Sequence, residues 1–321
     1  MLRNFQIYLR EGERKGKVAN TRELRRRIKS VKNTSQITRA MEMVAAVKMK
    51  RAQNQAVSGR PYSLNLSEAL TRLLPKVENE SHPLLLENGS DKKGVILLST
   101  DKGLCGSLNT NLFRMILSSH MSSSNVVYYT IGRKGRNFAV KTGKELIADF
   151  ENLDAVSFRQ SVQLAKMVVE SFKASEVGEV FLIYPRFVST IKQEPNMVKL
   201  LPIDIESVIA GEAKQSSNSN EKIATGSSNP RNDVGGSEYL FEPNIDTLLD
   251  SLLIHHVRIK IYQALLETKA SEHSSRMVAM KNATDNALEL TEDLTLTYNQ
   301  VRQDSITREI LEISSAAAAM E

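Results

Sequence analysis

Two very long stretches without glycine or proline constrain this chain of 321 residues most. The first covers residues 20–58 and ends before Gly59 and Pro61, and the second covers residues 245–319. Because glycine and proline are the residues that most often end helices, each stretch predicts one long helix. At about 1.5 Å per residue, with the first helix resuming after Pro61, the two would be roughly 80 and 110 Å long, which no compact domain accommodates.

Apolar residues recur in both stretches at the alternating spacing of three and four that marks a helix seam. The expected seam of the first helix is Leu24, Ile28, Val31, Ile37, Met41 and Val44. The expected seam of the second is Met280, Ala283, Ala287, Leu290, Leu294, Tyr298 and Val301, continued by Ile306, Ile310 and Ile313. Two such helices most simply bury their seams against each other, so we expect a long antiparallel two-helix coiled coil.

Between the helices the apolar pattern changes from helical spacing to short continuous runs. Residues 95–98, 126–129 and 180–184 are apolar or aromatic, and helical segments near 105–120 and 160–175 separate them. Short buried strands alternating with helices are typical of a Rossmann-like α/β sheet, so we expect a globular body over residues 75–210. We also expect a hairpin at its end, with its turn at Glu194-Pro195-Asn196.

The remaining segments read differently. Residues 211–237 are rich in Ser, Asn and Gly and predict a mobile loop, and residues 238–321 are expected to hold a foot segment followed by the C-terminal helix. Residues 1–17 mix basic residues with Glu11 and Glu13, which excludes a secretory signal peptide and leaves a weak amphipathic presequence as the alternative. We expect them to be an extension upstream of a natural start at Val18, so that residues 18–74 form the N-terminal helix.

The net charge of +6 hides an asymmetry between the two ends of the chain. Residues 21–60 hold 11 basic and 2 acidic side chains, and residues 238–321 hold 7 basic and 14 acidic ones. The basic helix is compatible with nucleic-acid binding, and a basic helical nucleic-acid-binding or scaffold protein is the alternative function class. That helix lacks aromatic stacking residues, however, and the chain supplies its own acidic complement, which favours a self-paired or solvated face.

Motifs for bond chemistry are lacking. The chain has no GxxxxGK[ST] phosphate loop, and the run Gly132-Arg133-Lys134-Gly135-Arg136 is read as a turn that opens a helix. The five histidines show no metal-ligand spacing, and the single cysteine, Cys105, is read as a small buried thiol. No run approaches the roughly 18 apolar residues of a membrane span. The sequence therefore predicts no cofactor, metal or catalytic site.

Four segments, in order, closely resemble the gamma subunit family of F-type ATP synthases. They are ANTRELRRRIKSVKNTSQITRAMEMVAAVKMKRAQ at 19–53, STDKGLCGSLNTNL at 99–112, EYLFEP at 238–243, and ASEHSSRMVAMKNATDNA with LTLTYNQVRQDSITREILEI within 270–313. The resemblance covers about residues 19–321. It implies a non-catalytic subunit of bacterial type, the central rotor stalk that couples ion translocation to ATP synthesis or hydrolysis at sites on the beta subunits.

The resemblance also implies partners and contact residues. The paired helices are expected to rotate inside a ring of alpha and beta subunits, and the base is expected to rest on epsilon and the membrane ring of c subunits, on the cytoplasmic side of the cell membrane. The resemblance places beta-subunit contacts at Met41, Lys48, Arg302, Gln303, Thr307 and Glu309. It places c-ring and epsilon contacts at Tyr239, Phe241 and Glu242. No nucleic acid is expected among the partners.

Overall fold

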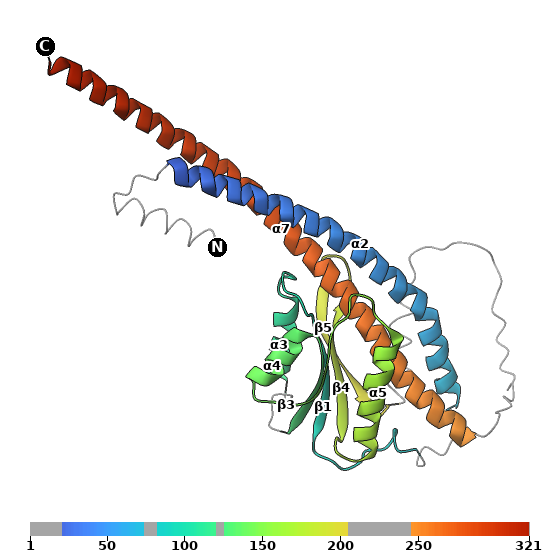
Figure 1. The fold of residues 1–321 in the computed structure, drawn as a ribbon. Helices are drawn as coiled ribbons and strands as arrows, with labels where there is room; N and C mark the ends of the chain where they lie inside the picture. Colours follow the sequence, from blue (N-terminus) through green and yellow to red (C-terminus); the bar gives the residue numbers. More distant parts are fainter. Residues whose placement is uncertain (1–20, 74–81, 120–124, 205–244, 321) are drawn as a thin grey trace, which may run out of the picture. The chain divides into compact units, whose positions relative to one another are not determined.

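A computed structural model describes residues 21–73, 82–119, 125–204 and 245–320 of the chain (Figure 1). These residues divide into two compact units, each described by itself below. The helical unit contains residues 21–44 and 277–320, and the sheet unit contains residues 45–276. The extension at 1–17, the loop at 211–237 and the foot residues Tyr239, Phe241 and Glu242 lie outside the described residues.

Both long helices are present, as predicted. Helix α2 runs over Thr21–Leu73 and α7 over Ile245–Ala318, so each contributes to both units. Pro61 lies inside α2 without ending it. Gly59 also lies inside α2, so the apolar seams outweigh these two breakers in the first helix, and α7 contains neither glycine nor proline.

The sheet unit contains one five-stranded sheet with the order β3-β2-β1-β4-β5. Its elements, in chain order, are β1 (Lys93–Leu98), α3 (Leu108–Ser118), β2 (Val126–Ile131), α4 (Arg133–Lys141), β3 (Glu145–Phe150), α5 (Phe158–Lys173), β4 (Glu179–Phe187) and β5 (Gln193–Leu201). The first four strands are parallel and β5 is antiparallel to β4. The three apolar runs of the sequence become β1, β2 and β4, which confirms the predicted Rossmann-like α/β sheet.

The predicted hairpin turn at Glu194-Pro195-Asn196 is wrong. These residues lie inside β5, where Pro195 is the register partner of Pro185 in β4. The chain reverses earlier, where Val188 and Ser189 donate backbone hydrogen bonds to the carbonyl of Lys192. β5 lies at the edge of the sheet, so the N–H group that Pro195 lacks removes no bond to a further strand.

Side chains alternate between the two faces of the sheet, and each face has its own helical cover (Figure 1). On one face, α3 and α4 bury Leu112, Ile116 and Ala139 against β1 and β2. On the other face, α5 and residues 249–265 of α7 form the larger core, which includes Phe172 and Leu253. The first part of α7 is therefore a layer of the sheet unit, whereas the sequence analysis ended the globular body at residue 210.

Two histidines on α7 are buried in the sheet unit and should make its stability sensitive to acid. Burial, with Lys260 and His255 as weaker contributors, lowers the pKa of His256 to about 3, and burial also lowers the pKa of His273 to about 4. A histidine with a lowered folded pKa stabilises the fold above its unfolded pKa of about 6.5, and this contribution is lost as pH falls below it.

At pH 5 we expect these histidines to cost about 2 kcal/mol each in free energy of unfolding, relative to pH 7.5. Urea denaturation at both pH values measures this loss. The variants His256→Gln and His273→Gln should each lose less stability between the two pH values than the unsubstituted chain, and equal losses would contradict the prediction.

Candidate functional site

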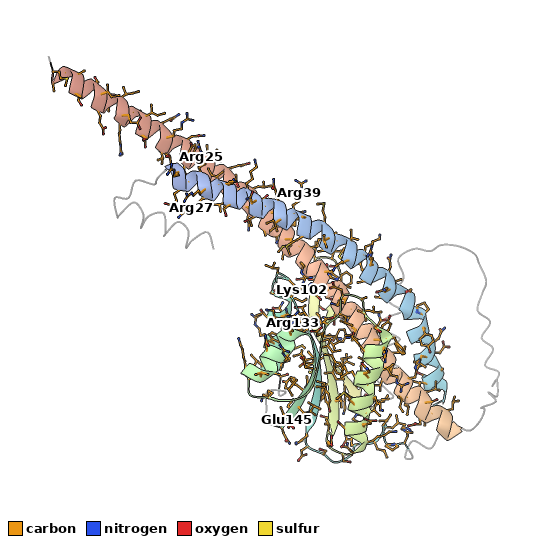
Figure 2. All side chains as sticks on the ribbon, viewed as in Figure 1. Arg25, Arg27, Arg39, Lys102, Arg133 and Glu145 are labelled. Atoms are coloured by element: carbon orange, nitrogen blue, oxygen red, sulfur yellow. The ribbon has the colours of Figure 1, made fainter. Side chains whose placement is uncertain are left out.

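The described part of the helical unit is an antiparallel helix pair held by a narrow, partly polar seam. The Thr38 and Thr284 hydroxyls lie 2.7 Å apart, and Arg25 donates a 2.9 Å hydrogen bond to the Tyr298 hydroxyl. As the residue number rises along α2 it falls along α7 at these two contacts, so the helices run in opposite directions. Figure 2 marks Arg25 on the α2 end of this pair. The predicted antiparallel coiled coil is confirmed.

The register of α2 differs from the predicted one after Val31. The predicted seam residues Ile37 and Val44 are 61% and 57% exposed, whereas Thr38 and Ala45, one position later in each case, are buried. Starting from Leu24, steps of four and three lead to Ser35 and Thr38, so the seam keeps its heptad through polar and small residues. Ile37 and Val44 therefore form, with the half-buried Met41 between them, a second apolar stripe about 100° around α2 from the buried seam.

The predicted seam of α7 is correct as far as Val301. Met280, Ala287 and Leu294 are buried, and Ala283, Leu290, Tyr298 and Val301 are partly buried. From residue 302 onwards every described residue of α7 is exposed. Ile306, Ile310 and Ile313 are 44%, 60% and 70% exposed, so the part of the prediction that placed them in the helix pair is wrong. In Figure 1 α7 continues past the first described turn of α2.

These exposed isoleucines and the four predicted contact residues of α7 share one side of the helix, which we call the tip face. At about 100° per residue, Ile306, Ile310 and Ile313 form a stripe with Arg302 and Glu309 along one border and Gln303 and Thr307 along the other. All seven fall within an arc of roughly 160°. Asp304, Arg308 and Leu311 occupy the opposite side. An apolar stripe between polar borders is suited to docking in a protein groove.

Met41 does not join the tip face. Antiparallel pairing through Thr38 and Thr284 places Met41 opposite residue 281 of α7, and about 21 residues of helix, roughly 30 Å, separate that position from Arg302. The helical unit therefore presents two separate candidate surfaces, the outward stripe of Ile37, Met41 and Val44 and the tip face.

Lys48 belongs to the sheet unit and already has a partner there. Its ammonium lies 2.9 Å from the carboxylate of Asp154, and the hydrogen bond from Lys48 lowers the pKa of that carboxyl. Both side chains are more than a third exposed, so the pair contributes little to stability. Any contact of Lys48 with a beta subunit would have to share the ammonium with Asp154.

The carboxyl edge of the sheet, where open α/β sheets bind nucleotides, has its helix amides occupied. The N–H of Arg133 donates to the Asp101 carboxylate at 2.8 Å, that of Lys134 to the Thr100 carbonyl, and that of Gly135 to the Ser99 hydroxyl. Lys102 and Arg133 lie near each other at this end of the unit, and Glu145 lies at the other (Figure 2). Gly132 precedes the first turn of α4, as predicted for this run. The first N–H groups of α4 donate to groups of the same chain and are therefore not available to a phosphate.

Other groups in the described ranges are engaged structurally. His82 and His255 bond Asp250 and Tyr62, and burial raises the pKa of the Cys105 thiol. Within those ranges no group of three or more metal-ligating side chains forms a site, and no helix is long and apolar enough to cross a membrane. The feature that the sequence does not reveal is a buried charged cluster at residues 269–276 of α7, because charged residues in a long helix are usually solvated and no local pattern indicates their burial.

Comparison with known proteins identifies a family and relatives to which this chain is similar. The family model described as ATP synthase matches residues 20–320. The chain is 42% identical over 302 residues to the ATP synthase gamma chain of Opitutus terrae, covering 94% of this chain and 99% of that one. It is 44% identical over 304 residues to the gamma chain of Akkermansia muciniphila, covering 95% and 100%.

Solved structures share the fold. The central stalk and c ring of the Tetrahymena thermophila mitochondrial ATP synthase contains a chain with 26% identity and a TM-score of 0.55, with 77% of this chain and 99% of that chain covered. A chain of the Euglena gracilis mitochondrial ATP synthase has a TM-score of 0.61 at 20% identity, with 94% of both chains covered, and this likeness supports the fold alone.

Proposed function

Since the chain belongs to the ATP synthase gamma chain family, we propose that it is the central rotor stalk of a bacterial ATP synthase. It couples ion translocation through a membrane ring of c subunits to ATP synthesis or hydrolysis on beta subunits, and it is itself non-catalytic. The observation that carries this function is the long antiparallel helix pair, which leaves two exposed apolar stripes along its described residues. The comparisons do not favour the nucleic-acid-binding alternative.

The physical basis of coupling is the asymmetry of the stalk. A helix pair with an apolar stripe on one side makes different contacts with three chemically identical beta subunits, and those differences bias each subunit toward a different nucleotide affinity. Rotation exchanges the three environments. Torque passes in either direction, so ion flow drives synthesis and ATP hydrolysis drives the reverse rotation.

The contact residues are assigned by surface. Met41, on the outward stripe, is proposed to contact the moving lever of the beta subunit. Lys48, further along α2, is proposed to contact the same lever. Arg302, Gln303, Thr307 and Glu309 on the tip face are proposed to hydrogen-bond a loop of beta, because such bonds depend on orientation and can act as a catch. Tyr239, Phe241 and Glu242 are proposed to contact epsilon and the c ring. Through these partners the chain would be peripheral to the cell membrane, on its cytoplasmic side.

Reconstitution with alpha and beta subunits tests the function. Native mass spectrometry and ATPase assays on the same sample should find one copy of this chain with three alpha and three beta subunits, and ATPase that depends on it. Steeply salt-dependent binding to DNA or RNA, without such a complex, would instead favour the alternative.

The proposed catch makes a mutational prediction. Replacing Arg302 and Gln303 with Ala should lower the ATPase of the assembled complex about tenfold, because a charge-assisted hydrogen bond is worth about 1.5 kcal/mol or more. Asp304→Ala with Arg308→Ala, on the opposite side of the same helix, is the matched control and should leave ATPase within twofold. Equal activities for the two double variants would remove the catch role.

A further inference from the structure

Residues 268–276 of α7 lie against the carboxyl edge of the sheet and are buried on nearly every side. Thr268, Ser271 and Ser274 are fully buried, and the charged side chains of Lys269 and Glu272 are only 3% and 5% exposed. A helix that covers a sheet with one face normally leaves its polar face in water. This segment instead places hydroxyl and charged groups inside the sheet unit, where each needs a partner.

Five polar side chains of this segment donate hydrogen bonds to backbone carbonyls elsewhere in the sheet unit. Ser271, Ser274 and Ser275 donate to the carbonyls of Pro185, Thr190 and Cys105 at 2.9, 2.6 and 2.6 Å. Lys269 donates to the carbonyl of Asn152 at 3.1 Å, and Arg276 donates to that of Gly103 at 3.3 Å. The five acceptors belong to the loops after β1 and β3, to β4, and to the β4–β5 turn.

A charged cluster within α7 orients Lys269 and Arg276, the two charged side chains that reach these carbonyls. The Glu272 carboxylate accepts from Lys269 at 3.3 Å and from Arg276 at 2.7 Å, and Arg276 also contacts the Nδ1 atom of His273 at 3.4 Å. Hydrogen bonds depend on direction, whereas apolar contacts do not. Turning α7 by one residue, about 100°, would break all five carbonyl contacts, although the ion pairs of Glu272 lie within α7 and would turn with it.

We propose that residues 269–276 form the torque joint of the rotor, the place where α7 is locked in rotation and height to the sheet unit. This proposal rests on the proposed function. Arg276 is the last residue of α7 in the sheet unit, so α7 continues into the helical unit directly after the joint. A firm joint carries each rotational step of the helical unit into the sheet unit. A loosened joint lets α7 twist on the sheet, so part of each step is lost.

The test uses the whole ATP synthase in vesicles and measures cations pumped per ATP hydrolysed. Glu272→Gln keeps the shape but leaves two buried cations without their carboxylate, and this ratio should fall at least threefold while the complex still assembles and hydrolyses ATP. Lys269→Met should lower the ratio similarly, and Lys269→Arg, which keeps the charge, should largely restore it. Glu170→Gln is the matched control, since Glu170 pairs with Lys166 on the surface of α5.

A second variant keeps the joint testable if Glu272→Gln does not fold. Ser271→Ala with Ser274→Ala and Ser275→Ala removes three directional bonds without stranding a charge, and it should lower the pumping ratio about twofold. An assembled variant of either kind that pumps as many cations per ATP as the unsubstituted complex would overturn the joint. Failure of the unsubstituted chain to assemble or couple would overturn the proposed function instead, so the two results are distinguishable.

Discussion

Substituting Gly132 with Ala should destabilise the sheet unit by about 3 to 5 kcal/mol, a shift of roughly 10 °C in its melting temperature. Gly132 joins β2 to α4 with a φ of +102°, which side chains rarely allow. A Cβ atom there would lie 2.4 Å from the carbonyl oxygen of Ser99. That oxygen accepts a hydrogen bond from Asn152, and the Ser99 hydroxyl accepts one from Gly135, so neither can move aside without breaking a buried contact.

Two further glycines separate the causes of this loss. Gly143 has a φ of +65° but open space around its Cβ position, so Gly143→Ala should report the backbone strain alone, about 1 kcal/mol. Gly103 has open space and no positive φ, so Gly103→Ala should change stability by less than about 0.5 kcal/mol. Thermal unfolding of the three variants measures all three effects. A Gly132→Ala loss no larger than that of Gly143→Ala would contradict the close approach of α4 to β1.

The elements that the sequence predicts best are those whose signal is local and repeated. The helices α2 and α7 follow from long runs with few breakers, and β1, β2 and β4 follow from continuous apolar runs in the interior of the sheet. β3 has an alternating pattern of exposure with charged residues at both Glu145 and Asp149, and it lies at an edge, so its apolar signal is weak. Pro195 and Asn196 suggested a hairpin turn, but both lie within β5, because an edge strand can contain a proline.

The register of the helix pair shows why apolar spacing alone does not predict the seam of α2. Ile37 and Val44 have the spacing of a seam, but the heptad set by Leu24 and Ile28 continues through Ser35 and Thr38. Small and hydroxyl-bearing residues give no hydrophobic signal even where they are buried, because their hydrogen bonds to nearby carbonyls compensate the burial. The apolar residues left outside this seam are available for other chains.

The same reasoning applies to the candidate sites. The tip-face and α2 contact residues came from resemblance to a family, since exposed Arg302 or Gln303 alone resembles any solvated helix face. What the structure adds is the stripe of isoleucines between them. The joint at residues 269–276 depends on carbonyls more than 80 residues away in sequence, as in the bond from Ser271 to Pro185 of β4, and no local pattern encodes such a contact.

Replacing Ile306, Ile310 and Ile313 together with Ser should weaken assembly of the chain with alpha and beta subunits about 100-fold. The three side chains are 44–70% exposed in this chain, and burying each one in a groove between alpha and beta subunits would contribute about 1 kcal/mol to binding. A fall in affinity of this size should appear in native mass spectrometry titrations as a shift of the half-assembly concentration. The polar borders of the tip face remain in this variant, so it isolates the apolar contribution.

Two single substitutions, one on the tip face of α7 and one outside it, decide whether the tip face or helix stability is responsible. Ile310 and Leu311 are 60% and 62% exposed and differ in position by about 100° around the helix. Ile310→Ser and Leu311→Ser therefore remove similar apolar surface, and any loss of helix propensity is the larger for Leu311→Ser, because Leu favours helix more than Ile or Ser does. Only Ile310 lies on the stripe between Arg302 and Gln303. Affinity for the alpha and beta subunits should fall several-fold for Ile310→Ser and little for Leu311→Ser. Equal losses would mean that binding depends on the stability of the helix and not on one face of α7.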